Sequence, residues 1–231
     1  MPFKTRSKKR SSKKRSRKVR FRRGRKPRTI YNKPTVNLGL GFPKKLVMTH
    51  KYFETVDIQN TAGSTANYQF RCNDLFDPNF TGTGHYPSFV TKMLTIYDHY
   101  TVIGAKCTLK FAHGVSGGVA ANACMYINDD TTITPTITSL MEQSTARTIF
   151  LPANTFDPKK ITLKWSAKKA FGRDILGNFS LRGDASAGPT ENQCFTFVIW
   201  PQDLASTQTY NLQWSLEYIA VWTEPKDISS A

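Results

Sequence analysis

Sixteen lysines and arginines occupy the first 28 positions of the chain, and no Asp or Glu lies among them. Like charges at this density repel one another, and the stretch has too few apolar residues to bury, so we expect it to be disordered when free. A disordered polycation binds nucleic acid without sequence preference, because each neutralised phosphate releases condensed counterions. The predicted nucleic-acid-binding residues are Lys4, Arg6, Lys8, Lys9, Arg10, Lys13, Lys14, Arg15, Arg17, Lys18, Arg20, Arg22, Arg23, Arg25, Lys26 and Arg28.

Short basic runs inside this arm also match the pattern of nuclear-import signals, so nuclear-import receptors are expected partners. A charged solubility tail and a membrane-surface segment are the alternatives for the arm as a whole, but the arm lacks the apolar face of an interfacial helix. Serines between the basic residues are either phosphorylation sites that would weaken binding or simple spacers. The residues assigned to nuclear import are Lys8, Lys9, Arg10, Lys13, Lys14 and Arg15.

The rest of the chain is almost neutral. The formal charge of the whole chain is +17, and the 17 basic residues after Arg28 stand against all 16 acidic ones, which leaves 17 − 16 = +1. Residues 29–45 contain two prolines and two glycines, a composition typical of a connector. We therefore predict a basic arm with its connector over 1–45 and one folded domain over 46–231, which is long enough to bury a substantial core.

The sequence of this body contains no recognisable catalytic or metal-binding pattern, so we expect neither an enzyme nor a cofactor. No phosphate-binding Gly-x-x-x-x-Gly-Lys loop occurs, and the glycine-rich segment 114–118 lacks a lysine and is interpreted as a hairpin turn between two strands. The four histidines have neither zinc-protease spacing nor a plausible nucleophile beside them. His99 is expected to be a hydrogen-bonded structural residue. Asp129 and Asp130 are either turn formers or oxygen ligands for a divalent ion at a subunit contact.

Three further groups of residues in the body leave their roles open. The loop aromatics Phe80, Tyr86 and Phe171 either stack on bases or fill the body and its interfaces, and burial is the commoner use. A second basic group either contacts nucleic acid or a glycosaminoglycan on a cell surface, or is a solvated loop face. The four cysteines lie far apart in apolar runs and are expected to be reduced, as in a nuclear or cytosolic setting. The second basic group comprises Lys159, Lys160, Lys164, Lys168, Lys169 and Arg173.

Apolar residues in the body recur with a period of two, which is typical of β-strands. In the last of these stretches, the residues of one face are Tyr210, Leu212, Trp214, Leu216, Tyr218, Ala220 and Trp222. In a second, over 101–111, Ile103 and Ala105 are expected to share a face with Cys107, Leu109 and Phe111. Shorter candidates are 50–58, 67–72, 119–128, 147–151, 160–165 and 193–200, and two short helices are expected within 87–97 and 136–143.

Glycine, proline and asparagine clusters separate these stretches, and no apolar run reaches the roughly 20 residues that cross a bilayer, so no membrane insertion is expected. The N-terminus also lacks the hydrophobic stretch of a secretory signal peptide. Eight antiparallel strands with long, uneven loops favour an all-β fold, an eight-stranded antiparallel jelly-roll sandwich preceded by the disordered basic arm. A Greek-key sandwich of another kind is the alternative.

Three segments of the body resemble a known protein family. They are residues 68–78 (YQFRCNDLFDP), 82–87 (GTGHYP) and 97–106 (YDHYTVIGAK), the last at the start of a long strand. Together with the basic arm, they resemble the capsid proteins of circovirus-like viruses, which have circular, Rep-encoding single-stranded DNA genomes. The chain departs from the best-studied of these capsids in its arm, which mixes lysine and serine with arginine.

This resemblance implies a jelly-roll subunit that self-assembles into a small icosahedral shell of sixty copies. The arm would then face the packaged DNA and direct the protein to the host nucleus before it enters the virion, and a host surface receptor or glycosaminoglycan is a further expected partner. The alternatives are the coat of a satellite-type single-stranded RNA virus and a cellular nucleic-acid-binding β-barrel with a basic tail. An enzyme on a cupin-like jelly roll would need a metal triad that these residues do not offer.

Overall fold

The structure is a computed structural model, and it describes residues 41–114, 118–129, 137–155, 157–203 and 205–227. The basic arm and nearly all of the connector lie outside these residues. The predicted disorder of the arm and the predicted domain boundary after residue 45 therefore stay predictions.

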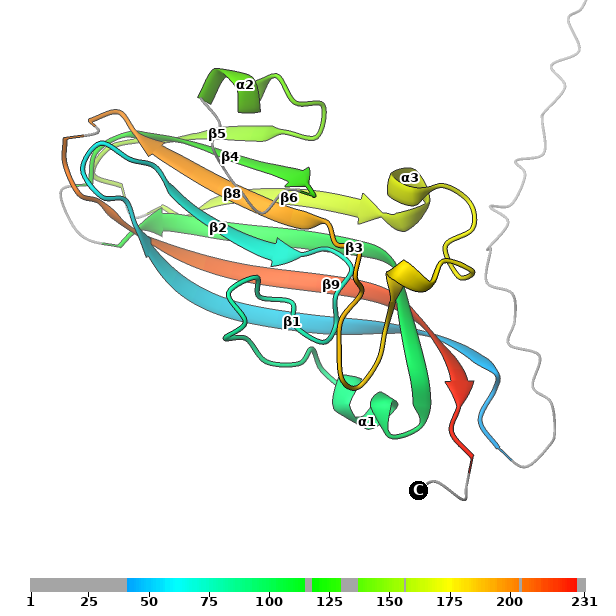
Figure 1. Ribbon diagram of the computed structural model, residues 1–231. Coiled ribbons are helices and arrows are strands. Elements are labelled where there is room, and N and C mark those ends of the chain that lie inside the picture. Colours follow the sequence, from blue (N-terminus) through cyan, green and yellow to red (C-terminus); the bar gives the residue numbers. More distant parts are fainter. Residues whose placement is uncertain (1–40, 115–117, 130–136, 156, 204, 228–231) are drawn as a thin grey trace, which may run out of the picture. The chain divides into compact units, whose positions relative to one another are not determined.

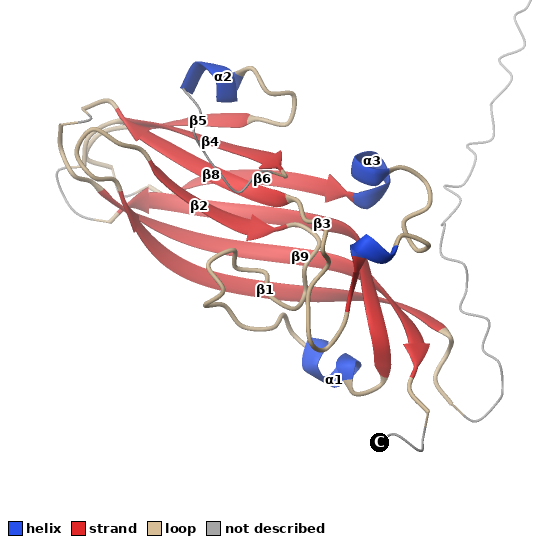
Figure 2. Cartoon of the chain, viewed as in Figure 1, coloured by secondary structure: helices blue, strands red, loops and turns tan. Residues whose placement is uncertain are grey.

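The described residues form two antiparallel sheets (Figure 2). The first sheet has the strand order β1-β9-β3-β6, and the two-residue strand β7 also pairs with β3. These strands are β1 (Lys45–Gln59), β9 (Thr209–Pro225), β3 (Tyr97–His113), β6 (Lys159–Ser166) and β7 (Arg182–Gly183). The second sheet has the order β2-β8-β4-β5. Its strands are β2 (Ala66–Arg71), β8 (Cys194–Pro201), β4 (Ala121–Asn128) and β5 (Arg147–Leu151).

The strands pair in a nested order along the chain. β1 pairs with β9, β2 with β8, β3 with β6 and β4 with β5, so the chain follows one long antiparallel hairpin. Two further pairings, β3 with β9 and β4 with β8, join the arms of that hairpin sideways into two sheets. A rolled hairpin of eight strands divided between two sheets is a jelly roll. This confirms the expected fold of the body, and each of the eight predicted segments coincides with one of these strands (Figure 1).

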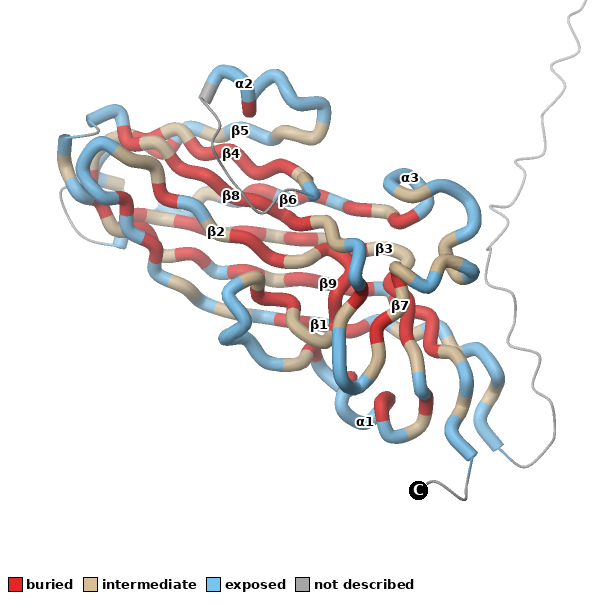
Figure 3. The backbone as a smooth tube through the Cα atoms, in the orientation of Figure 1, coloured by how far each residue is buried: buried red, intermediate tan, exposed pale blue. Residues whose placement is uncertain are grey.

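The core lies between the two sheets and explains the period-two pattern (Figure 3). All seven predicted inward residues of β9 are fully buried, and they meet Phe70 of β2 and Phe195 and Phe197 of β8 in one hydrophobic cluster. Trp214 lies at its centre, with its ring 4.7 Å from that of Phe70 and 6.3 Å from that of Phe197. Burying side chains of this size is the main favourable contribution to folding.

Short helices fill the connections between strands. They are α1 (Val90–Leu94), α2 (Ile137–Met141), α3 (Ala167–Phe171) and the 3-10 turn η1 (Phe179–Leu181). The first two confirm the expected helices, whereas α3, η1 and strand β7 were not expected. Leu140 of α2 packs with residues of β4 and β8 in a second, smaller cluster, which explains why β8 is apolar on both faces.

Three of the expected structural features differ from those of the folded chain. The expected hairpin across 114–118 is wrong, because the flanking strands β3 and β4 belong to different sheets and do not pair. Tyr97 is not helical but opens β3. Ile103 does not share the inward face, because a β-bulge between Val102 and Gly104 shifts the alternation by one residue, so Val102 is buried in its place.

Candidate nucleic-acid interface and subunit contact surfaces

The predicted nucleic-acid-binding and nuclear-import residues, from Lys4 to Arg28, all lie outside the described residues. Their roles therefore remain a proposal. The structure does locate the second basic group. Lys160 and Lys164 lie on the exposed face of β6, Lys159 is half-buried at the start of that strand, and Lys168 and Lys169 are exposed on α3. The group is therefore mostly a sheet surface and a short helix, not a loop face.

Exposed apolar side chains mark two candidate contact surfaces. The first lies at one end of β1 and β9, where Val47 stands opposite Val221 and the neighbouring Ile219 stands opposite Thr49. Val47 is 50% exposed and Ile219 is 41% exposed. Phe42, just before β1, adds a ring that is 60% exposed. Apolar groups of this size at a surface are typical of sites where proteins associate.

The second surface is a pocket of about 190 Å³ on the outer side of the second sheet. Phe150 of β5, Met141 of α2 and Trp200 of β8 are among the residues that line it. Phe150 is 48% exposed and Met141 is 51% exposed, although both are large apolar side chains. Among the described residues β5 is also an edge strand of its sheet, with no strand paired to it on one side.

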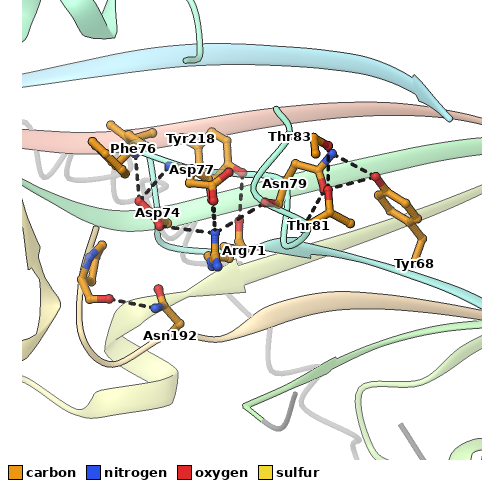
Figure 4. A network of polar contacts seen from close by, with 12 residues as sticks. Tyr68, Arg71, Asp74, Phe76, Asp77, Asn79, Thr81, Thr83, Asn192 and Tyr218 are labelled. Atoms are coloured by element: carbon orange, nitrogen blue, oxygen red, sulfur yellow. Dashed lines mark hydrogen bonds and ion pairs between the residues drawn. The ribbon is translucent and has the colours of Figure 1, made fainter. Parts of the chain in front are cut away.

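A polar network fixes the segment that carries the resemblance (Figure 4). The Arg71 guanidinium, at the end of β2, lies 2.8 Å from the Asp77 carboxylate and donates to the Asp77 carbonyl oxygen at 2.7 Å. The Tyr218 hydroxyl of β9 donates to the Arg71 carbonyl oxygen at 2.8 Å, so the network also joins the two sheets. The Arg71 guanidinium lies 5.1 Å from the centre of the Phe80 ring, a cation–π contact.

Asp74 is the buried carboxylate of this network. It accepts hydrogen bonds from the Tyr100 hydroxyl at 2.9 Å and from the backbone N–H of Phe76 at 2.8 Å. Burial raises the pKa of the Asp74 carboxyl, and the hydrogen bond from Tyr100 opposes that shift. The loop after β2 is thus tied to β3 through Tyr100, and its tip, residues 81–85, is exposed.

A second part of the same network holds that tip. Asn79 donates from its side-chain amide to the Tyr68 hydroxyl at 2.9 Å and to Glu54 at 3.0 Å. The Asn79 side-chain oxygen accepts from the Thr81 backbone N–H at 3.1 Å and from its hydroxyl at 2.9 Å. The resemblance over residues 68–87 thus falls on a loop with a structural polar network, and Figure 4 shows the side chains of Tyr68, Asn79 and Thr81 close together there.

Two histidines, His99 and His50, have polar partners on other elements of the fold, and the expected structural role of His99 stays a prediction. His99 Nε2 lies 3.4 Å from a Glu224 carboxylate oxygen. His50 is fully buried, donates from Nδ1 to the Ser88 carbonyl oxygen at 2.8 Å and accepts from Trp222 Nε1–H at 3.0 Å. Because Nε2 is an acceptor in this arrangement, His50 is held neutral, and burial lowers its pKa.

No cluster of three or more potential metal ligands occurs among the described residues. Asp129 is exposed in the bend after β4, and Asp130 lies outside the described residues, so the choice between turn former and ion ligand stays open. Over the same described part of the chain, no helix has the length and apolarity needed to span a membrane.

The three aromatic residues Phe80, Tyr86 and Phe171 pack within the body, and the four cysteines are buried there. Tyr86 packs edge-on to Phe76 with ring centres 5.6 Å apart, and Phe171 packs on Trp165 at 6.2 Å. These rings, like that of Phe80 under Arg71, are occupied by packing within the body. All four cysteines are buried and free, in agreement with the expected reduced state.

No protein-family model matches this chain, and no curated protein matches it. Solved structures similar to it include those of viruses and of capsid proteins. Desmodium yellow mottle tymovirus is 13% identical, with 83% of this chain and 94% of that chain covered and a TM-score of 0.43. The 60-mer BFDV capsid protein is 15% identical, with coverages of 80% and 98% and a TM-score of 0.44. The T=3 Penaeus vannamei nodavirus is 13% identical, with coverages of 79% and 55% and a TM-score of 0.48. These structures come from several groups of viruses and do not single out a circovirus-like one.

Proposed function

We propose that this protein is a structural coat protein that self-assembles into a small icosahedral shell and packages nucleic acid through its basic arm. The observation that carries the proposal is the division of the chain into a +16 arm and a nearly neutral jelly-roll body. A polycation without a partner domain would bind nucleic acid but enclose nothing. A neutral body with exposed apolar surfaces can associate with copies of itself without charge repulsion.

The finer form of the proposal is a sixty-subunit shell around circular single-stranded DNA, formed after import into the host nucleus. It is supported by the likeness of residues 68–106 to circovirus-like capsids and by the basic runs between Lys8 and Arg15. Phosphate contacts alone do not distinguish DNA from RNA, so the enclosed nucleic acid has to be identified by digestion with DNase and RNase.

The test is the size and content of purified particles. Sixty subunits of 26.1 kDa form a particle on the order of 1.6 MDa. In a full-length arm-neutral variant, the sixteen arm lysines and arginines are replaced by glutamine. We expect this variant to keep a folded body and to lose most of its nucleic acid at moderate salt. A native protein that remains a nucleic-acid-free monomer at low salt, or an arm-neutral variant that retains nucleic acid fully, would overturn the proposal.

A further inference from the structure

Five lysines converge on the outer face of the first sheet, from three strands that are far apart in the sequence. In the strand register, Lys106 of β3 stands opposite Lys164 of β6, and Lys110 stands opposite Lys160. Lys51 of β1 lies in the same row as Lys106, because both stand opposite Glu217 of β9. We call Lys51, Lys106, Lys110, Lys160 and Lys164 the lysine face.

The alternation of side chains along each strand places these five lysine side chains on the outer face of the sheet. The neighbours of these lysines along the strands, such as Tyr52, Cys107 and Leu163, are buried in the core between the sheets. Since successive side chains of a strand point to opposite faces, the lysines all point away from the core. Lys51, Lys110, Lys160 and Lys164 are exposed, and the Lys106 side chain is 41% exposed.

The lysine face lacks the acidic partners that would neutralise it. Directly opposed like charges on neighbouring strands destabilise a sheet, and β3 and β6 contain two such pairs. In these rows the one carboxylate is that of Glu217, which lies 3.2 Å from Lys106 Nζ. Five lysines against one glutamate leave a formal charge of +4 on a patch whose lysine rows are about 13 Å apart. A second copy of the same face would be repelled by this charge. The ligand that the lysine face favours is therefore a polyanion.

Between the two rows of lysines lies a cross-strand row of residues that can bind the phosphate and the base of a nucleotide. Thr108 and Thr162 stand opposite each other there, with their hydroxyl oxygens 3.4 Å apart, and threonine hydroxyls are common phosphate donors. In the same row Phe53 of β1 is 58% exposed, two strands away from Thr108 with Ser215 between them. An exposed aromatic ring beside a basic surface is the arrangement on which single-stranded bases stack.

We propose that the lysine face is a second nucleic-acid site, on the folded body, for single-stranded DNA or RNA. Phosphates contact the lysines and threonines of β3 and β6, and a base stacks on Phe53. The site reads no base edges, so it has no sequence preference. Phe53 favours nucleic acid over a sulfated polysaccharide, because a saccharide offers no base to stack. The inference deepens the proposed function, since the packaged strand would then contact the body as well as the arm.

The test uses the full chain with the arm intact. The face-neutral variant is K106Q/K110Q/K160Q/K164Q, and the matched control K44Q/K92Q/R147Q/K226Q removes the same charge at exposed positions outside both basic groups. Binding of a fluorescent single-stranded oligothymidylate is titrated over a series of salt concentrations. Each lost phosphate contact lowers the slope of log affinity against log salt by about 0.7, so the face-neutral variant should lose about 3 from the slope and the control nothing comparable.

A second variant tests the stacking contact. We expect Phe53→Ala to weaken oligothymidylate binding about tenfold at constant salt slope, because stacking contributes affinity but releases no counterions. Circular dichroism and the thermal midpoint check folding. The face-neutral variant should melt no lower than the native protein, since repulsion is removed. If it fails to fold, the pair K110Q/K160Q and Phe53→Ala are measured in its place, with an expected slope change of about 1.4 for the pair.

An unchanged slope in a face-neutral variant that still assembles and retains nucleic acid would overturn this inference and leave the proposed function standing. Loss of heparin binding with unchanged oligothymidylate binding would assign the face to a glycosaminoglycan, and would also overturn it. Failure of the native protein to assemble, or full retention of nucleic acid by the arm-neutral variant, would instead count against the proposed function.

Discussion

Removing one oxygen atom from Tyr100 should destabilise the body strongly, because its hydroxyl lies at the centre of the buried network around Asp74. The hydroxyl donates to the Asp74 carboxylate at 2.9 Å and accepts from the backbone N–H groups of Leu75 at 3.2 Å and Phe76 at 3.0 Å. In Tyr100→Phe, Phe76 N–H keeps its bond to Asp74, but Leu75 N–H loses its partner and the carboxylate loses a donor.

The magnitude follows from these two losses. A hydrogen bond to a charged group contributes about 1.5–3 kcal/mol, and a buried donor left unpaired costs about 1–3 kcal/mol. The Tyr100 ring stays in place, so no large cavity forms. We therefore expect the free energy of unfolding to fall by about 3 kcal/mol, a large part of the stability of a typical domain.

The chain offers a matched control for this substitution. Tyr210 of β9 is also fully buried, but its hydroxyl has no hydrogen-bond partner among the described residues. Tyr210→Phe removes the same atom without breaking a bond and should be neutral or slightly stabilising.

Urea unfolding of unassembled subunits, followed by circular dichroism, measures both variants. Hydrogen exchange at the Leu75 amide should also accelerate in Tyr100→Phe only. Equal effects of the two substitutions, or a change below about 0.5 kcal/mol for Tyr100→Phe, would refute the assigned role of the network.

Two further predictions follow from buried titratable groups. Burial lowers the pKa of His50 in the folded state, so the stabilising contribution of neutral His50 should be fully present above its unfolded pKa of about 6.5. The free energy of unfolding should then decrease as the pH falls from about 6.5 toward the folded pKa. Urea unfolding of His50→Gln should lack that part of the pH dependence. Burial raises the pKa of Cys124 and of Cys194 to about 11. Both thiols should therefore react slowly with a thiol-reactive dye at pH 8 in the folded protein and rapidly in urea. Fast labelling of the folded protein would contradict their buried positions.

Much of the fold could be predicted because a strand that is buried on one face has to alternate. The seven inward residues of β9 and the eight strand positions depend on that local rule alone, and the structure agrees with them. The rule fails where the backbone adds a residue. At the bulge between Val102 and Gly104 the alternation shifts. Gly104 is a residue type that often marks a bulge inside a strand, but the alternation rule takes no account of it.

Connections between strands were less predictable than the strands themselves. A short glycine-rich stretch in a sequence does not say whether the strands on either side of it pair, and the expected pairing of β3 with β4 was wrong. Strand β7, which pairs with β3 at Tyr100 and Thr101, was missed because two residues are too few for any period.

The sequence by itself determined the segregation of charge into the first 28 residues, the β-rich body and its inward side chains, because each depends on composition or on neighbours along the chain. Only the tertiary structure decided which strands lie side by side. Lys106 and Lys164 are 58 positions apart in the sequence, and their pairing across β3 and β6 depends on how the hairpin rolls up to bury its aromatic core. The polar network at Asp74 and the lysine face therefore appear only in the folded chain, because contacts between distant segments are set by the packing of the whole core.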